Sequence, residues 1–396
     1  MLSRDKDLVQ YILQKNHKNY YKSTIQTKYL SKYLGMGLLT ANGPFWLRQR
    51  RLIQPAFHKK KMDSLVGLMQ STIEKGLRQL PTNGPTDVFP IMNELAFNVV
   101  ATSLFNLTVD EDTLTRLQTI IQDIQLFLVK EVRLPHKGWW FKLSGQVKAH
   151  LDLAEESRSI IREIIKERKA TGESYDDLLD MLLATRYEDT GEPMSTKQLI
   201  DEISILFVAG HETTANALAF TSYLLAKHED VQQRVFMEIR EAHEMSENPL
   251  EQIKLLPYTR AVIDESMRLY PPAWITDREN VKDDTIGAYH IKKNTLVGVS
   301  FYELHRNPKY WSDPEAFQPE RFMGERRKET AGAYFPFGAG PRMCIGMGFA
   351  IYEMVLAIAY LVKNYELSTE IDTPQLNPLI TLKPVDLFVE FKKRKS

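Results

Sequence analysis

The feature that most constrains the fold is a long proline- and glycine-rich stretch, residues 306–346, which follows the helical part of the chain. It shows little periodicity, and irregular stretches of this length inside a compact domain are usually functional or disordered. The stretch ends in FPFGAGPRMCIG, which contains Cys344, the only cysteine of the chain. Apolar residues with helical spacing follow over 345–364. The fold must therefore hold a cysteine-bearing loop directly before an apolar helix.

Helical periodicity dominates residues 43–267. Ser195 and Gln198 fit a capping box, which predicts a long helix that runs on to His228. Short β-type runs at 285–291 and 295–301 predict a small amount of sheet. The fold class expected is therefore mainly α with small β-sheets, in one domain over residues 1–396. The other helices are expected at 46–57, 62–80, 110–132, 151–171, 175–187 and 256–270.

Composition excludes several classes of protein. The 396 residues contain 51 Lys and Arg against 51 Asp and Glu, so net charge gives no reason to expect a nucleic-acid partner. One cysteine cannot form an internal disulfide. The uninterrupted apolar runs are too short to span a bilayer, and the first residues, MLSRDKDLVQ, are too polar for a signal peptide. A reduced, cytoplasmic protein without a membrane span is expected.

Cys344 lies in a context that favours metal binding. A lone cysteine is most often a small buried hydrophobic residue. Here it comes just before a helix, whose dipole favours a thiolate, and Arg342 adds a cation two residues earlier. Gly338, Gly340 and Gly346 allow the backbone to approach closely. With no second Cys or His nearby, the loop does not fit a zinc site, but it suits haem iron, because the porphyrin supplies four ligands.

The loop resembles the cysteine signature of the cytochrome P450 superfamily, Phe-x-x-Gly-x-x-x-Cys-x-Gly, at Phe337, Gly340, Cys344 and Gly346. The resemblance implies the cytochrome P450 fold, with a long central helix over the haem and Cys344 as the axial ligand of haem b. It also implies a monooxygenase that inserts one oxygen atom from O2 into a hydrophobic organic substrate. The electrons would come ultimately from NAD(P)H through partner proteins.

A second motif, AGHETT, lies at residues 209–214 on the long helix. It is not a zincin motif, because position 215 is Ala instead of His. The Thr213 hydroxyl can bond back to the carbonyl of Ala209, which would widen or kink the helix beside Gly210. The resemblance places Ala209 at the cofactor. It also makes Glu212 and Thr213 an acid–alcohol pair that delivers protons during oxygen activation.

Glu265 and Arg268 stand three residues apart on a predicted helix. Such pairs are usually weak surface contacts. The resemblance instead implies a structural Glu-x-x-Arg pair. Arg321 would join it and hold the irregular stretch against the helix.

Trp46 and Arg50 share one helix face and could form a simple cation–π pair. The resemblance implies that both reach a haem propionate. Two buried propionates need cationic partners. Arg342 would be another partner, and Arg278 a further one by its position in the family.

Residues 46–61 are strongly basic and contain no acid. This is either a solvated basic face or a docking patch for an acidic electron donor. The chain shows no candidate flavin or nicotinamide domain, so the resemblance implies a separate ferredoxin or flavodoxin with its reductase. The residues of this basic face are Arg48, Arg51, Lys59, Lys60 and Lys61.

Two alternatives stay open: a peroxide-driven peroxygenase, and a non-catalytic haem-binding sensor or paralogue. Trp46 lies nearer the N-terminus than the family usually places it, so the usual first helix and opening strands are expected to be missing. By resemblance, five mostly apolar segments would face the substrate: 34–39, 127–132, 205–209, 272–275 and 378–379.

Overall fold

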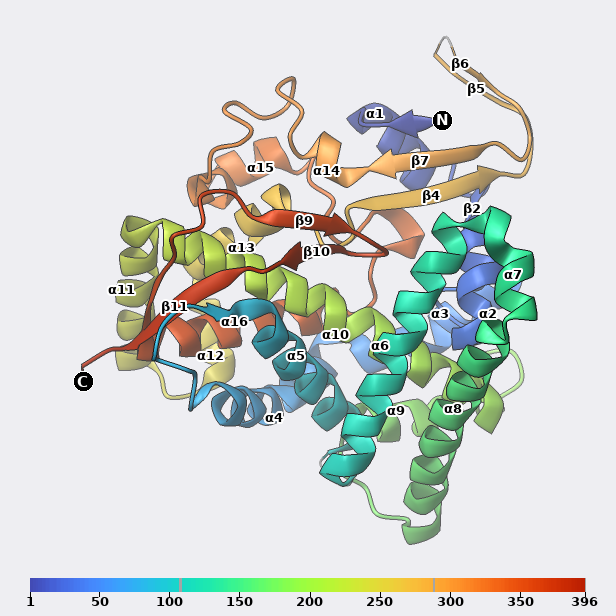
Figure 1. The fold of residues 1–396 in the computed structure, drawn as a ribbon, viewed down its shortest axis with the longest axis horizontal. Coiled ribbons are helices and arrows are strands. Elements are labelled where there is room, and N and C mark those ends of the chain that lie inside the picture. Colours follow the sequence, from blue (N-terminus) through green and yellow to red (C-terminus); the bar gives the residue numbers. More distant parts are fainter. Residues whose placement is uncertain (107–108, 288, 396) are drawn as a thin grey trace.

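In the computed structural model, residues 1–106, 109–287 and 289–395 are described, and they form a mainly helical fold with small sheets (Figure 1). The α-helices are α1 (Lys6–Gln10), α2 (Ser31–Leu34), α3 (Gly43–Ile53), α4 (Lys59–Leu77), α5 (Val88–Phe105), α6 (Glu111–Arg133), α7 (Gly138–Leu143), α8 (Gln146–Thr171), α9 (Leu178–Ala184), α10 (Thr196–Lys227), α11 (Glu229–Met245), α12 (Pro249–Lys254), α13 (Pro257–Leu269), α14 (Phe301–Leu304), α15 (Arg326–Thr330) and α16 (Met347–Asn364). This confirms the expected fold class.

The long helix α10 crosses the middle of the molecule, with α5 beside it (Figure 1). Its start is the predicted one, because the Ser195 side chain accepts from the backbone N–H of Gln198 at 3.2 Å. The Gln198 side chain does not close a capping box. It donates instead to the carbonyl of Met36. This contact ties the beginning of α10 to the segment that precedes α3.

Helix α5 was not predicted, because its apolar residues surround the whole helix and leave no amphipathic pattern. The rings of Phe97 and Phe105 pack against Phe207 of α10, with centroids 5.5 and 5.6 Å apart. A helix that is apolar on all sides belongs in the core, and α5 fills that place beside α10.

Other helix boundaries differ from the predicted ones for local reasons. Helix α3 ends at Ile53, and a 3₁₀ turn containing Pro55 continues to Phe57. Proline has no N–H to donate, which stops the α-helical hydrogen-bond pattern. Helix α9 covers only Leu178–Ala184 of the predicted 175–187, and α8 begins five residues before the predicted 151.

The sheets are small, and the largest has the strand order β1-β7-β4-β2. In this sheet β1 runs parallel to β7, while β7–β4 and β4–β2 are antiparallel. Strands β1 and β2 lie in the segment before Trp46, where the usual opening strands were expected to be missing. The strands are β1 (Leu2–Ser3), β2 (Tyr20–Tyr21), β3 (Thr86–Asp87), β4 (Ile275–Asn280), β5 (Asp284–Ile286), β6 (Tyr289–Ile291), β7 (Leu296–Ser300), β8 (Tyr365–Ser368), β9 (Gln375–Pro378), β10 (Leu382–Val385) and β11 (Phe388–Lys393).

Two of the helices, α5 and α16, are long and apolar enough to cross a membrane by length and composition. Of the residues in their apolar windows, 78% in α5 and 50% in α16 are buried inside the protein. Core helices of this kind meet the same criterion, so length and composition are weak evidence for a membrane span.

Candidate active site

The cysteine loop is held in one shape by backbone contacts. The N–H of Cys344 donates to the carbonyl of Phe337 at 2.9 Å. Gly340 has φ +70°, and a Cβ there would lie 2.0 Å from the carbonyl oxygen of Leu13. Both the left-handed backbone and this close approach require glycine. The loop therefore depends on Gly340 for its packing against the N-terminal segment.

The Cys344 side chain is exposed. Burial by the surrounding protein nevertheless raises the pKa of its thiol, while a hydrogen bond from the Gly346 N–H and the charge of Arg50 act in the opposite direction. An N–H at the start of the helix thus favours the thiolate as predicted, but the cation that acts on Cys344 is Arg50 instead of the predicted Arg342, and desolvation outweighs both. The thiol is therefore accessible to solvent, although the protein surrounds it closely.

The AGHETT motif on α10 also contains an accessible residue in otherwise buried surroundings. Ala209 is exposed, although it lies in the middle of a largely buried helix. The Thr213 hydroxyl donates to the Ala209 carbonyl at 2.7 Å, as the sequence predicts. Helix α10 stays α-helical here, so the predicted widened turn does not form. Ala209 and Cys344 are the kind of small, accessible positions that a flat cofactor between α10 and the cysteine loop would need.

Glu212 has a partner that sequence reasoning missed. The hydroxyl of Thr381, between β9 and β10, donates to Glu212 Oε1 at 2.8 Å. The side-chain amide of Asn216 in turn donates to the Thr381 oxygen at 3.0 Å. Asn216 and Thr381 are both buried. Asn216 thus donates to Thr381, and Thr381 donates its hydroxyl proton to Glu212. This hydrogen bond orients the Glu212 carboxylate.

Of the predicted propionate-binding arginines, Arg342 lies over Trp46, which is buried. The guanidinium of Arg342 is 5.1 Å from the centre of the Trp46 ring. Its Nη1 donates to the Tyr20 carbonyl at 3.0 Å, but its buried Nε has no partner within the described residues. Arg50 reaches the cysteine loop instead, donating from Nη1 to the carbonyl of Met343 at 2.9 Å.

Arg278 of β4 and Lys22 are buried, and with the half-buried Arg50 and Arg342 they form a group of cations. Burial, together with the nearby Arg342, lowers the pKa of Arg278 to about 10. Burial and the charges of Arg278, Arg342 and Arg50 lower the pKa of Lys22 to about 6. Lys22 Nζ donates to the carbonyls of Leu38 and Ala41. No sequence motif marked Lys22, because its neighbours in the fold are distant in the chain.

This cation group, defined as Lys22, Arg50, Arg278 and Arg342, forms no ion pair within the described part of the chain. The acid that acts on Lys22 is Glu202, whose own pKa burial raises to about 7. Buried charges are costly unless an opposite charge compensates them. The group therefore fits a doubly anionic ligand, and the two propionates of a haem would supply that charge. With Cys344 as iron ligand, the residues present fit a haem.

Glu265 of α13 lies between both predicted arginines. Arg268 contacts it with Nε and Nη2, at 2.7 and 2.8 Å, and Arg321 Nε lies 3.3 Å from Oε1. The Arg268 and Glu265 side chains are fully buried. Arg268 also donates to the carbonyls of Pro314 and Ala316 in the irregular stretch. The network thus attaches that stretch to α13.

The predicted basic face is partly neutralised in the structure. Arg48 pairs with Asp189 at 3.0 Å, and Arg51 lies 3.9 Å from Glu188. These acids belong to the segment between α9 and α10, which the sequence does not place near α3. Lys61 lies 3.9 Å from Asp176. Lys59 and Lys60 are exposed and form no ion pair within the residues described.

The expected substrate-facing segments gather in two places. Residues from 34–39, 127–132 and 205–209 meet in one apolar cluster around Leu34, Phe127 and Ile205. The segments 272–275 and 378–379 are joined where Trp274 Nε1 donates to the carbonyl of Leu379 at 3.1 Å. The first group is a buried apolar cluster, which is the kind of environment that a hydrophobic ligand requires.

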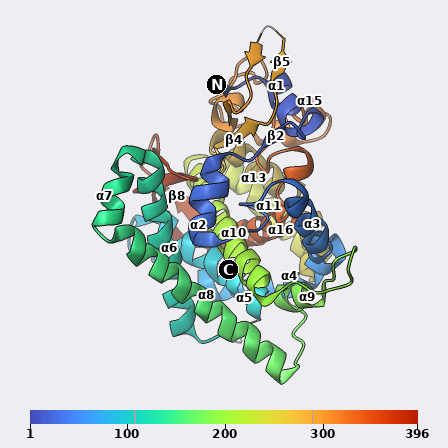
Figure 2. The same ribbon diagram turned by 90° about the vertical axis from the view of Figure 1, so that its right-hand side faces the viewer.

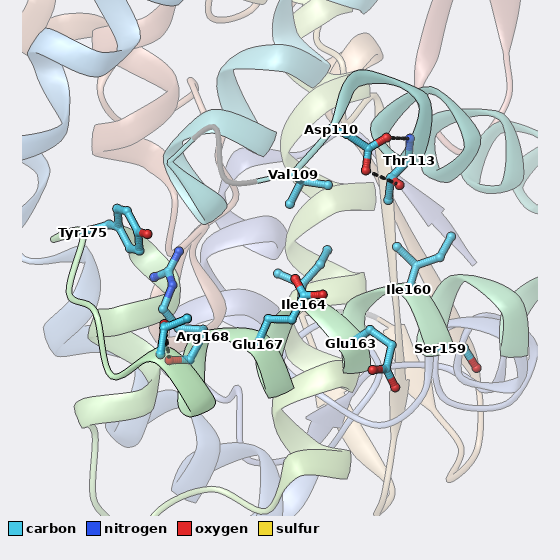
Figure 3. Close-up of a pocket in the computed structure, with 11 residues that line it drawn as sticks. Val109, Asp110, Thr113, Ser159, Ile160, Glu163, Ile164, Glu167, Arg168 and Tyr175 are labelled. Carbon is cyan, nitrogen blue, oxygen red and sulfur yellow. Dashed lines mark hydrogen bonds between the residues drawn. The ribbon is translucent and has the colours of Figure 1, made fainter.

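A cavity of about 540 Å³ lies elsewhere, between α6 and α8 (Figure 3). Arg168, which lines this cavity, forms ion pairs with Asp177 and Asp180 and lies beside the Tyr175 ring. Figure 3 shows Asp110 turned toward Thr113, its hydrogen-bond partner. None of the predicted site residues lines this cavity.

Known proteins of similar sequence show which family the chain belongs to. The family model "Cytochrome P450" matches residues 1–391. Cyclooctat-9-en-7-ol 5-monooxygenase of Streptomyces melanosporofaciens is 34% identical over 84% of this chain and 73% of its own length. Echinocystic acid 23-monooxygenase of Saponaria officinalis is 32% identical over 91% of this chain and 73% of its own.

Among solved structures, the haem domain of cytochrome P450DA is similar in fold. Its TM-score is 0.89 at 24% identity, covering 100% of this chain and 88% of that one. The family model and the two relatives determine the assignment, and the solved structure confirms the fold. The chain belongs to the cytochrome P450 family and is a haem monooxygenase of that family.

Proposed function

We propose that this enzyme inserts one oxygen atom of O2 into an apolar organic substrate, with Cys344 as the axial ligand of haem b and electrons from a separate protein. The observation that carries the proposal is the accessible Cys344 thiol close to Arg50, which belongs to a cation group that forms no ion pair within the described residues. The apolar cluster around Leu34, Phe127 and Ile205 supports an apolar substrate.

Trp46, Lys22, Arg50, Arg278 and Arg342 would hold the propionates. The unpartnered Nε of Arg342 supports this role, since a buried donor without an acceptor is costly. Two propionates would also restore the charge of Lys22, whose pKa is lowered by burial and by the neighbouring guanidinium groups. Gly338 and Gly346 would allow the loop to approach the ring closely.

When bound, a thiolate-ligated haem supplies the activation of dioxygen that oxygen insertion requires. Thr213 and Glu212 would supply protons to that reaction. The Thr213 hydroxyl, bonded to Ala209, is held at the accessible face of α10. The Glu212 carboxylate would take up protons and pass them to Thr213 Oγ1 through water. Thr381 would hold Glu212 in position.

The electron donor would be a ferredoxin or flavodoxin, reduced ultimately by NAD(P)H, that docks at the basic face. Docking would depend mainly on Lys59 and Lys60, because Arg48 and Arg51 are already paired with acidic side chains. Electrostatic docking is steered by unpaired charge. Lys59→Glu with Lys60→Glu should slow reduction by an acidic ferredoxin, more at low salt than at high salt. An unchanged rate would remove these lysines from the docking surface.

A carbon monoxide spectrum tests the central proposal. The reduced protein with carbon monoxide should show the strongly red-shifted Soret band of thiolate-ligated haem, and Cys344→Ser should abolish it. A band typical of histidine-ligated haem would contradict the assignment. Turnover with ferredoxin and its reductase, compared with turnover on peroxide alone, separates a monooxygenase from a peroxygenase. Haem binding without turnover in either assay would indicate a non-catalytic protein.

A further inference from the structure

The segment between α9 and α10 contains a short acidic turn. Residues 187–192, with the sequence YEDTGE, include acids but no basic residue. Backbone hydrogen bonds close the turn. The N–H of Tyr187 donates to the carbonyl of Glu192 at 2.9 Å, and the N–H of Gly191 donates to the carbonyl of Tyr187 at 2.8 Å. This turn, residues 187–192, is the acidic strap.

One residue of the acidic strap anchors it to α3. The guanidinium of Arg48 lies over the Tyr187 ring, 3.8 Å from its centre. The Tyr187 hydroxyl accepts a hydrogen bond from Nε2 of Gln49 at 2.8 Å, and Gln49 is fully buried. Helices α3 and α9 accordingly lie on the same side of the molecule (Figure 2). The aromatic side chain thus fixes the position of the strap without any help from its acids.

The acids of the strap neutralise two arginines of the basic face. Nε and Nη2 of Arg48 both donate to Oδ1 of Asp189, at 3.3 and 3.0 Å. Arg51 lies 3.9 Å from Glu188. These four side chains are between 41% and 74% exposed. Exposed ion pairs are weak and are screened by salt, so the strap can leave the two arginines at a small cost in free energy.

The covered part of α3 lies against the cysteine loop. Arg50 stands between Arg48 and Arg51 in the sequence, and its Nη1 donates to the carbonyl of Met343 at 2.9 Å. The charge of Arg50 also acts on the Cys344 thiol. An acidic protein that is steered to this part of α3 needs unpaired positive charge there. The strap supplies the negative charge that such a protein would otherwise bring.

We propose that the acidic strap covers part of the surface on which the electron donor docks, and that an acidic donor must displace it to reach Arg48 and Arg51. This device requires the docking at the basic face that is proposed above. Two weak ion pairs are a small obstacle to a partner that carries many acids and a larger one to a weakly acidic protein. The strap would therefore discriminate among donors, with Lys59 and Lys60 as the first point of contact.

Reduction of the haem-loaded protein by an acidic [2Fe–2S] ferredoxin tests the strap. Glu188→Gln with Asp189→Asn should raise the second-order rate of reduction by about fivefold at low salt, because the ferredoxin no longer competes with the strap. The difference should disappear at about 1 M salt, where charges are screened beyond about 3 Å. Reduction by photoreduced deazaflavin, a small uncharged donor, should not change.

The control removes two negative charges from another part of the surface. Glu241→Gln with Glu244→Gln makes the same change of net charge at exposed positions on α11, which lies across the molecule from α3 (Figure 1). This variant should speed reduction by less than about twofold, because distant charges are screened. Equal acceleration in the two variants would overturn the proposal, since overall charge would then explain it.

The lysine variant separates failure of the strap from failure of the docking surface. An unchanged rate in the strap variant, while Lys59→Glu with Lys60→Glu slows reduction, would remove the strap and leave the docking at the basic face intact. If neither pair of substitutions changes the rate, the docking at the basic face is wrong, and the strap has no role in electron transfer.

Hydrogen exchange gives a readout that needs no electron transfer. In the oxidised, haem-loaded protein, the amides of residues 187–192 should exchange faster when ferredoxin is added, because a displaced strap loses its contacts with α3. Residues 59–61 should exchange more slowly, because the donor covers them. Slower exchange in the strap would make it part of the interface, and unchanged exchange would leave it in place. Either result would overturn the proposal.

Discussion

The hydroxyl of Thr381 donates a hydrogen bond to the carboxylate of Glu212 across 2.8 Å, although the two residues lie 169 positions apart in the chain. The contact joins the turn between β9 and β10 to the central helix α10. Asn216, one helical turn after Glu212, donates to the same hydroxyl. If Glu212 relays protons, Thr381 is the residue that positions it.

Thr381→Val should therefore lower the yield of product per electron pair by about tenfold, since hydrogen bonds to charged groups contribute about 1.5–3 kcal/mol. Thr381→Ser keeps the hydroxyl and should restore coupling. The measurement is product and peroxide formed per NAD(P)H consumed. Thr221→Val, which also removes a buried hydroxyl from the interior, is the matched control for stability. Full coupling in Thr381→Val would show that Glu212 needs no such support.

Thr213→Ala should uncouple electron consumption from product and release peroxide, because the accessible hydroxyl on α10 is lost. The expected loss of coupling is on the order of tenfold or more. Thr214 gives a matched control, since its hydroxyl makes the equivalent bond to Gly210, and Thr214 is buried. Thr214→Ala should leave coupling nearly unchanged. Similar effects of the two substitutions would point to helix geometry instead of proton delivery.

Lys22 should make the stability of the haem-free protein depend on pH. Its pKa is lowered to about 6 in the folded chain, against about 10.4 when unfolded. Between these values the unfolded state binds one more proton, so the free energy of unfolding rises with pH, by up to about 1.4 kcal/mol per pH unit. Urea unfolding at about pH 7 and about pH 9 measures this slope.

Lys22→Met should reduce the slope of the unfolding free energy against pH by the contribution of about one bound proton. Haem binding should likewise reduce this slope in the original protein, because the propionates would keep Lys22 charged. The slopes are compared instead of the stabilities, because Lys22→Met also removes the hydrogen bonds from Nζ to the backbone and so changes the stability itself. An identical slope in the variant would show that Lys22 does not titrate in this range.

Arg268→Ala should strongly destabilise the protein, because it leaves Glu265 buried without its bidentate partner. Breaking a buried ion pair in this way costs about 3–5 kcal/mol. Arg240→Ala is the control, since Arg240 and Glu244 form an exposed pair at 3.9 Å, worth at most about 1 kcal/mol. Chemical unfolding and haem retention are the readouts. Equal stability of the two variants would mean that the Glu265 network does not hold the irregular stretch.

The sequence alone was enough for the mainly helical fold class, the cysteine loop and the start of α10 at Ser195. These features depend on contacts between near neighbours in the chain. The Ser195 cap involves the residue three positions on, and Thr213 bonds to a carbonyl four positions back. Helix α5 was not predicted, because helical periodicity is visible only when one face is apolar and the other polar. A helix that is buried on all sides has no such pattern.

Tertiary structure alone decided which distant groups meet. Lys22 joins Arg278 and Arg342, Thr381 holds Glu212, and loop acids neutralise Arg48 and Arg51. None of these contacts follows from spacing, because each depends on how helices and turns far apart in the sequence pack together. The sequence determined the residue types that can bind haem and move protons. Burial in the folded chain determined the charge state of Lys22, since desolvation and neighbouring cations lower the pKa of its ammonium group.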